Sequence, residues 1–440
     1  MSHSVALCIP THGRSELVRD FLESCADYYI PSGVDIYYYD SSADRQTEAV
    51  VTSWKDQEHV HYIRMEGAPL GEKLLRIFQG DGLRKEYDFL WLSNDATQFI
   101  PSDLALILQN LSESYDFIEF DNFPNIETRV FTDPDELLGA NTNCVHIGAS
   151  VMNVRTMLRD VDWSKYEKYF TDGQAYNNNS YYIFYFVRFL ELNNFHALHL
   201  RISGMRVSPL KKSTFYSHDL VSQTVENTVA VHCQLPVRYS NRWKSCAWCA
   251  SMIVLGTFSD ILLYRREGFY SLRHFIRYWS NWDKVTSLPR SQLFIAAILP
   301  RRFLTWQYEK RKQNGLKRLR DFCERHKKIA IYGAGTRGNV MGEYMELHHI
   351  PYDCYCVTSR RPGKTEFRQH PVRAFSEIDA EELKDTGFVL SLYQIYLDEV
   401  LSALLEKVDR RDILYDIQFD KDIRYELGYR TDITGLLNNR

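Results

Sequence analysis

The sequence lacks the features that mark several classes of protein. It contains no uninterrupted apolar stretch of about 18 residues, so we expect no transmembrane helix. Its net charge of −4 gives no excess of basic residues, which argues against a nucleic-acid-binding protein. Repeats and low-complexity tracts are missing as well. What remains is the composition of an ordinary globular enzyme or binding protein.

Cysteine forms neither a disulfide framework nor a zinc site. The nine cysteines are odd in number and scattered, and no secretory signal precedes them, so we expect a reduced, cytoplasmic environment. Cys246 and Cys249 have C-x-x-C spacing, but no second such pair or histidine pair completes a metal site. We assign this pair to the core of a helix, with metal or redox use as the alternative.

Length and aromatic content are the first positive signals. A chain of 440 residues is expected to form two or three domains. Aromatic residues make up 14% of the sequence and include 29 tyrosines. Tyrosine-rich surfaces often stack on sugars, but tyrosines also fill protein cores, so both interpretations stay open.

The first part of the chain, residues 1–212, alternates short apolar runs with helical patterns. Strands are predicted over 4–11, 34–42, 59–65, 86–95 and 115–123. This rhythm is typical of an open, largely parallel α/β sheet, in which ligands bind beyond the carboxyl ends of the strands. The rule brings five residues around one crevice: Thr11, His12, Asp40, Asn94 and Asp95.

The middle part, residues 213–326, is predicted to be helical and is rich in aromatic and basic residues. Its apolar face could pack on the protein's own sheet, and we prefer this connector role. A basic amphipathic stretch can also lie on an anionic membrane surface, which would give peripheral membrane contact through 243–325 at the inner face of the membrane.

The last part, residues 327–440, begins with strand, glycine-rich turn, helix and strand. Gly333, Gly335 and Gly338 fit G-x-G-x-x-G in this context and predict a Rossmann-like α/β domain with a second nucleotide site. The acidic residue that would bind a ribose is missing near Thr358 and Ser359. We therefore do not expect this domain to bind NAD(P). A structural or dimerising role, which would make the protein a homo-oligomer, is as good an interpretation as nucleotide binding.

Several residues of the crevice suit a nucleoside diphosphate. Pro10, in "IPTHGR", is rigid and lets a ligand approach the backbone, and Asp40 could accept hydrogen bonds from a base imide or a ribose hydroxyl. Arg14 and Lys73 are candidate partners for the diphosphate charge. Asp95 ends the fourth strand, where its carboxylate could hold Mg²⁺ or Mn²⁺, cations that prefer oxygen ligands.

The order and spacing of these signals resemble family 2 glycosyltransferases. "LCIPTHGRSELVRDFLESC" is similar to the opening I-P-[TV]-Y-N-R and helix of that family, and "IYYYDSSADRQTEAVV" to its second-strand D-x-S-[ST]-D-x-T element. "EGAPLGEKLLRIFQ", around Gly71, resembles the segment before the next helix. "YDFLWLSNDATQFIPSDLALIL" resembles the strand that carries D-x-D. The likeness covers about residues 4–150 and continues more weakly over 141–157 and 169–191.

The resemblance implies a GT-A-type mixed sheet, a nucleotide-sugar donor, most simply a UDP-sugar, and inverting transfer to a glycan, lipid-linked or protein acceptor. Such an enzyme would build a bacterial surface polysaccharide or glycoconjugate. It also implies donor contacts from Pro10, Thr11, His12, Arg14, Asp40, Ser41, Gly71, Lys73, Asn94 and Asp95. The family usually places its general base in the segment that corresponds to 165–175, where Asp172 is our choice, with Glu167 second. His218 is a weaker candidate for a late metal or phosphate contact.

One departure from the family pattern affects the metal. Where the family shows D-D-D or D-x-D, this chain has Asn94, Asp95 and Ala96. If the motif aligns with these three residues, both outer carboxylates are lost and only Asp95 remains; if it aligns with Ser93 and Asp95, the second carboxylate is kept. An amide oxygen can coordinate a cation but brings no charge, so metal affinity should fall. We expect Mg²⁺ or Mn²⁺ to be held weakly by Asp95, with a larger share of the work for Arg14 and Lys73.

Two other functions remain open at this point. The chain could be an NAD(P)-dependent oxidoreductase or epimerase that uses the C-terminal glycine motif, although no Tyr-x-x-x-Lys or other hydride-site pair is recognisable. It could also be a catalytically inactive nucleotide-binding scaffold, an interpretation that only the altered D-x-D supports.

Overall fold

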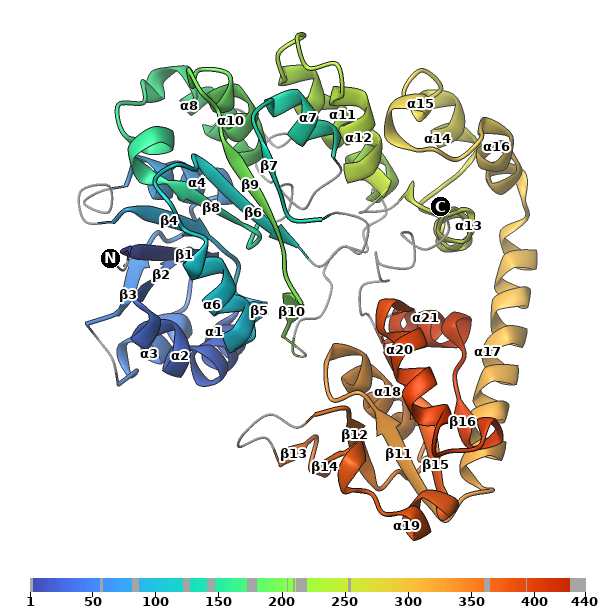
Figure 1. Ribbon diagram of the computed structural model, residues 1–440. Helices are drawn as coiled ribbons and strands as arrows, with labels where there is room; N and C mark the ends of the chain where they lie inside the picture. The colour runs from blue at the N-terminus through green and yellow to red at the C-terminus, as the bar shows by residue number, and fades with distance from the viewer. Residues whose placement is uncertain are drawn as a thin grey trace. The chain divides into compact units, whose positions relative to one another are not determined.

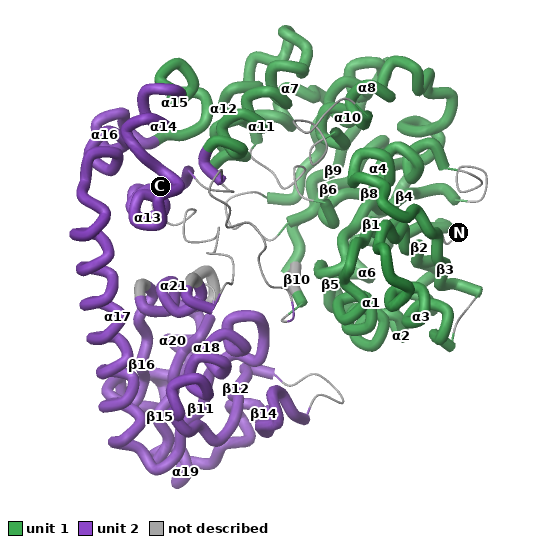
Figure 2. Tube along the Cα trace, turned by 180° about the vertical axis from the view of Figure 1, so that it is seen from behind, with its two compact units in different colours: residues 1–208, 222–253, 278–287 green, residues 209–221, 254–277, 288–440 purple. Residues whose placement is uncertain are grey.

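The structure is a computed structural model that describes residues 3–55, 58–80, 87–121, 127–140, 147–171, 180–203, 205–208, 210, 220–251, 255–359, 365–392 and 394–427. The chain divides into two compact units, coloured separately in Figure 2. Unit 1 consists of residues 1–208, 222–253 and 278–287, and unit 2 of residues 209–221, 254–277 and 288–440. The division at 1–212, 213–326 and 327–440 stays a prediction.

Unit 1 is built on an eight-stranded sheet with the order β3-β2-β1-β4-β8-β6-β9-β7 (Figure 1). Its strands are β1 (Val5–Thr11), β2 (Val34–Asp40), β3 (Val60–Arg64), β4 (Phe89–Leu92), β6 (Phe117–Asp121), β7 (Arg129–Phe131), β8 (Ser150–Asn153) and β9 (Ala197–Arg201). Four neighbouring pairs run parallel and three, all involving β7 or β8, run antiparallel. The sheet is therefore mixed, and the five strands predicted from the sequence are confirmed.

Helices cover both faces of this sheet, which explains why a strand such as β1 is buried along its whole length. One core lies under α1 (Ser15–Phe21), α2 (Asp27–Tyr29), α3 (Gln46–Thr52) and α6 (Pro101–Gln109). The opposite core lies under α4 (Leu70–Gln79), α7 (Pro134–Gly139), α8 (Glu167–Thr171) and α10 (Ser180–Phe189). A short antiparallel pair, β5 (Thr97–Phe99) and β10 (Met205–Val207), follows β4.

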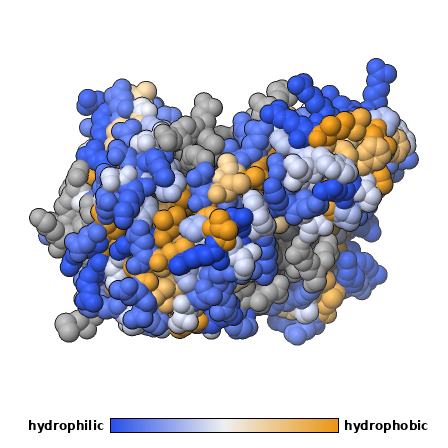
Figure 3. Space-filling model, turned by 90° about the horizontal axis from the view of Figure 1, so that it is seen from above, coloured by the Kyte–Doolittle hydropathy of each residue, from blue (hydrophilic) through white to orange (hydrophobic). Residues whose placement is uncertain are grey.

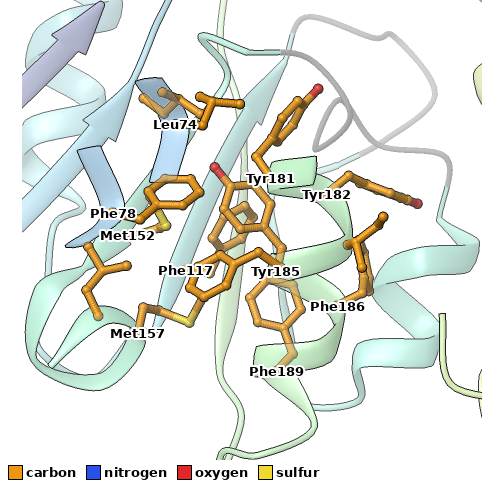
Figure 4. Close-up of a cluster of buried hydrophobic side chains, with 14 of the residues drawn as sticks. Leu74, Phe78, Phe117, Met152, Met157, Tyr181, Tyr182, Tyr185, Phe186 and Phe189 are labelled. Carbon is orange, nitrogen blue, oxygen red and sulfur yellow. The ribbon is translucent and has the colours of Figure 1, made fainter. Parts of the chain in front are cut away.

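The second of these cores is unusually aromatic. Figure 4 shows side chains of α4 and α10 packed together with side chains of one face of the sheet. Tyr181, Tyr182 and Tyr185 are at most 3% exposed, and Phe78 stacks on Phe184 with ring centroids 5.0 Å apart. These tyrosines fill the core. The packing also holds α4 against the sheet, with the first turn of α4 next to the carboxyl ends of the strands.

The middle of the chain is helical, as predicted. Its helices are α11 (Leu220–Gln234), α12 (Arg242–Ala250), α13 (Phe258–Glu267), α14 (Leu272–Arg277), α15 (Trp282–Val285), α16 (Arg290–Ile298) and α17 (Arg301–Cys323). Of these, α12 and α15 belong to unit 1, while α13, α14, α16 and α17 belong to unit 2. Helix α13 begins with a capping box, in which Thr257 and Asp260 each bond the other's backbone N–H.

Unit 2 contains a six-stranded sheet with the order β13-β14-β12-β11-β15-β16. The strands are β11 (Lys328–Tyr332), β12 (Cys354–Val357), β13 (Glu366–Phe367), β14 (His370–Ala374), β15 (Thr386–Leu390) and β16 (Ile413–Leu414), parallel except for β13. Helices α17, α18 (Thr336–Leu347) and α21 (Ile417–Glu426) cover one face, and α19 (Ala380–Asp385) and α20 (Gln394–Leu405) the other. The predicted Rossmann-like α/β domain is confirmed as a fold.

Candidate functional site

The centre of the candidate site is a buried carboxylate beneath an exposed cation. Strands β1 and β4 are parallel neighbours, so Thr11 at the end of β1 lies beside the residues that follow β4. Thr11 Oγ1 donates to Asp95 Oδ2 at 2.8 Å, and Arg14 Nη1 donates to Asp95 Oδ1 at 3.1 Å. The side chain of Asp95 is 1% exposed, whereas that of Arg14 is 44% exposed. The Arg14 guanidinium therefore places a positive charge at the protein surface beside the strand ends, and its bond to the buried Asp95 holds it there.

Asp40 lies next to Thr11 in the register of β1 and β2, but its carboxylate faces the protein interior. It is fully buried and accepts hydrogen bonds from the backbone and hydroxyl of Ser42, and from Tyr62 at 3.0 Å. Burial and the bond to Asp40 raise the pKa of Tyr62 to about 12. Ser42 Oγ in turn accepts from Gly13 N at 2.7 Å. In this arrangement Asp40 fixes two loops against each other, and its direct contact with a nucleotide stays a prediction.

Lys73, on the first turn of α4, joins the ends of two strands. Its Nζ donates to Thr11 O at 2.8 Å and to Ser41 Oγ at 2.9 Å. Burial lowers its pKa to about 8, while the carboxylates of Asp40 and Asp95 act in the opposite direction. Lys73 is only 3% exposed, which distinguishes it from Arg14 as a partner for a ligand.

The remaining predicted donor residues lie around the same edge. His12 is exposed and its Nδ1 lies 3.2 Å from Ser41 Oγ, while Pro10 is buried in β1 and Gly71 in α4. A hollow of about 280 Å³ adjoins them, lined by Met65, Glu66, Gly67, Ala68, Glu72 and Arg76. The backbone joins this hollow to the strand end, because Gly67 N donates to Ser41 O at 3.1 Å.

Asn94 serves the turn after β4. Its Oδ1 accepts from Ala96 N and Thr97 N, both at 3.0 Å, and its Nδ2 donates to Thr97 Oγ1 at 2.8 Å and Ile147 O at 2.5 Å. An amide offers two donor hydrogens and one acceptor oxygen, so each of its polar atoms is engaged within the protein. The amide stabilises the turn that delivers Asp95.

These contacts do not fit a divalent cation. Asn94 uses its oxygen for backbone donors, and the guanidinium beside Asp95 would repel a metal ion at that carboxylate. Among the residues that the structure describes, no group of three or more His, Cys, Asp and Glu side chains is placed to hold a metal. In the described part of the chain Asp95 is thus not part of such a group, and its role as a metal ligand stays a prediction.

Two of the predicted acceptor-side residues, Asp172 and His218, lie outside the described residues. Glu167, the second choice for the general base, is exposed at the start of α8. Its role stays a prediction.

A buried charged cluster in the sheet was not predicted. His199 on β9 pairs with Glu119 on β6, with Nδ1 3.1 Å from Oε1, and its Nε2 lies 3.7 Å from Asp121 Oδ1. All three side chains are fully buried. Burial opposes a charge on His199, but the two carboxylates outweigh it and raise the pKa of the imidazole. The sequence feature that could have indicated this cluster is the presence of charged residues inside the apolar runs "FIEFD" and "ALHLR".

In unit 2, the glycine motif forms the predicted turn between β11 and α18. Gly333 has φ of +120°, and an added Cβ would lie 2.7 Å from Ser391 O, so the turn itself requires glycine. At Gly338 a Cβ would overlap the backbone of Gly333, whereas at Gly335 it would meet nothing within 4 Å. The packing thus explains the first and third glycines without a nucleotide.

Cys246 and Cys249 lie buried in α12, as predicted. Burial raises the pKa of the Cys249 thiol to about 12. A thiol with this pKa is a packing residue at neutral pH.

Comparisons with known proteins give structural neighbours only; no protein-family model and no curated protein matches the chain. One neighbour is a mannosyltransferase from Pyrobaculum calidifontis, solved with GDP-Man and Mn²⁺ (10% identity, 68% of this chain, 87% of that chain, TM-score 0.35). Another is glucosyl-3-phosphoglycerate synthase from Mycobacterium tuberculosis, with phosphoglyceric acid (12% identity, 53% and 81%, TM-score 0.33). A third is S. aureus TarS 1–349 with UDP (12% identity, 67% and 86%, TM-score 0.36).

These neighbours are glycosyltransferases, the class that the resemblance in the sequence indicates. All three TM-scores lie below 0.5.

Proposed function

We propose that the chain is a glycosyltransferase that moves a sugar from a nucleotide-sugar donor, most simply a UDP-sugar, to a hydroxyl of a glycan, lipid-linked or protein acceptor. The observation that carries the proposal is the exposed Arg14 guanidinium, held by the buried pair Asp95 and Thr11 at adjacent strand ends. A guanidinium has five N–H donors, so its bond to Asp95 is compatible with bidentate binding of a phosphate. Strand ends of parallel α/β sheets are where such ligands bind.

In the proposed complex, the diphosphate lies over Arg14 and the nucleoside in the hollow lined by Glu66 and Glu72. Their carboxylates are exposed and suit the hydroxyl groups of a ribose. The exposed imidazole of His12 lies on the same loop as Arg14 and would face the phosphates. Lys73 and Asp40 hold the loops that carry these groups.

The proposed reaction is a single inverting displacement. A carboxylate, for which Asp172 is our choice, takes the proton of the acceptor hydroxyl, and the oxygen attacks the anomeric carbon. The bond from that carbon to the nucleoside diphosphate breaks, and the electron pair leaves with the diphosphate oxygen. Arg14 stabilises the charge that develops there. Asp172 holds the proton until it is released to solvent.

We infer that a divalent metal adds little to this site, because Asn94 and Asp95 are committed to other partners. In an assay with EDTA, turnover should persist at a similar rate. Loss of turnover that only Mn²⁺ or Mg²⁺ restores would contradict the inference.

The proposed activity can be tested by release of nucleoside diphosphate from a panel of nucleotide sugars with candidate acceptors. Arg14→Ala and Asp95→Ala should each reduce turnover by about a hundredfold or more, the scale for removing one group that stabilises transition-state charge. Asp27→Ala, which breaks a surface pair with Lys55 at 2.7 Å, is the matched control and should keep full activity.

Three outcomes separate the alternatives. Release that depends on Arg14 and Asp95 supports the transferase. Nucleotide binding without release with any donor and acceptor would indicate an inactive scaffold. Saturable NADPH binding by calorimetry, unaffected by Arg14→Ala, would favour an oxidoreductase that uses the Gly333–Gly338 turn.

A further inference from the structure

Large apolar side chains gather at the surface of three helices in unit 2. Those at least 41% exposed on α14, α16 and the first turns of α17 are Leu272, Ile276, Phe294, Ile295, Ile298, Phe303 and Trp306, which we call the apolar face. They fall within 35 residues of the 440 and include more than half of the exposed large hydrophobic residues in the described chain. In Figure 3 a group of apolar atoms is visible at the right, where α14 and α16 lie. Isolated exposed hydrophobic residues are normal, but a group of this size indicates an interaction surface.

The helices that carry the apolar face are firmly packed on their other side. In α16, Leu293, Ala296 and Ala297 are buried, while Phe294, Ile295 and Ile298 point outward. The ring of Phe294 contacts buried Phe275 of α14, with centroids 5.6 Å apart. The helices are therefore already packed on their buried side, and the exposed apolar side chains are not needed for that packing.

The chain segments that carry the apolar face have charged residues of one sign. Residues 272–277 and 290–308 contain five arginines and one histidine, and neither aspartate nor glutamate. The arginines are Arg273, Arg277, Arg290, Arg301 and Arg302. This absence of carboxylates contrasts with the chain as a whole, whose net charge is −4.

We propose that the apolar face binds the surface of a membrane that contains anionic phospholipids. Aliphatic and aromatic side chains would enter the boundary between headgroups and acyl chains, and the arginines would pair with phosphate groups. Trp306, stacked on Phe303 with centroids 6.2 Å apart, is a residue type that suits this boundary. Among the described helices, none is both long and apolar enough to cross a membrane, so the contact proposed is peripheral.

The charge pattern argues against a second copy of the chain as the occupant. A two-fold contact would place the same segments on both sides and bring their arginines close to the same arginines of the second copy. An anionic bilayer supplies both the apolar medium and the negative charge.

The proposal can be tested by sedimentation of the full chain with vesicles of phosphatidylcholine alone and of phosphatidylcholine mixed with phosphatidylglycerol. Binding should require phosphatidylglycerol and weaken as salt is added. Arg273→Glu with Arg302→Glu should weaken binding by at least about fivefold per arginine, the fold-change that corresponds to about 1 kcal/mol. Ile276→Glu with Ile298→Glu should abolish binding to the vesicles that contain phosphatidylglycerol.

The matched control is Val237→Glu, at a side chain of unit 1 that is 82% exposed and lies outside the apolar face. This variant should bind anionic vesicles like the unmodified chain, and thermal unfolding should show that all variants are folded. Equal binding to both vesicles, no binding, or self-association removed by the Ile276 and Ile298 changes would each overturn the proposal. The test does not use the transferase activity, so either proposal can fail alone.

Discussion

At the scale of the residue, two cations near Asp95 have opposite surroundings. Arg14 is half exposed and Lys73 is buried, although both side chains lie at the same strand ends. Arg14 can meet a ligand without moving, whereas Lys73 would first have to leave Thr11 O and Ser41 Oγ. The structure thus suits Arg14 to ligand binding and Lys73 to holding the loops in place. Residue type alone does not distinguish these two roles.

The lowered pKa of Lys73 predicts a pH effect on stability. The unfolded chain keeps this proton up to about pH 10.5 and the folded chain only to about pH 8, so stability should rise with pH between these values. Lys73→Met removes this rise, and the stability difference between unmodified chain and variant should grow from pH 8 to 10.5. Urea unfolding across this window measures it. Parallel curves would contradict the prediction.

Asn94→Asp places a second carboxylate next to Asp95, and we expect it to destabilise the turn. A carboxylate cannot donate to Thr97 Oγ1 or Ile147 O, and leaving such groups unpaired costs about 1–3 kcal/mol. The melting temperature should fall, and calorimetry should show no gain in Mn²⁺ affinity. Asn314→Asp, at an exposed position in α17, is the control. A more stable, Mn²⁺-binding variant would refute the turn role.

At the scale of the element, apolar runs bounded by turn residues were sufficient to predict β1, β2, β3, β4 and β6, and the turn at Gly333. Adjacent parallel strands then placed Thr11 beside Asp40 and Asp95 correctly. The direction of each side chain could not be predicted, because it depends on hydrogen bonds to residues far along the chain, such as Tyr62 to Asp40. The His199 cluster was missed for the same reason, since Glu119 lies 80 positions away.

Helix α17 offers a test in which two effects oppose each other. Gly315→Ala raises helix propensity by about 1 kcal/mol, but the added Cβ would overlap the buried ring of Phe419 on α21. Overpacking costs about 1–3 kcal/mol, so we expect a net loss of stability in urea. Asn314→Ala, exposed on the preceding position, should instead be neutral or stabilising. A stabilised Gly315→Ala would show that Phe419 moves aside.

At the scale of the whole molecule, the chain contains separate cores in its two units. Differential scanning calorimetry should therefore resolve two transitions. Asn94→Asp should lower one of them and Gly315→Ala the other. A single transition shifted by both variants would show that the units unfold together.

The apolar face of α14, α16 and α17 also has a practical consequence for work with the isolated protein. In buffer without lipid, the same side chains favour adsorption to tubes and clumping as the protein is concentrated. Raising the salt would aggravate the problem, because salt screens repulsion between the arginines that keep molecules apart. Low ionic strength with a mild detergent should therefore give the best-behaved preparations.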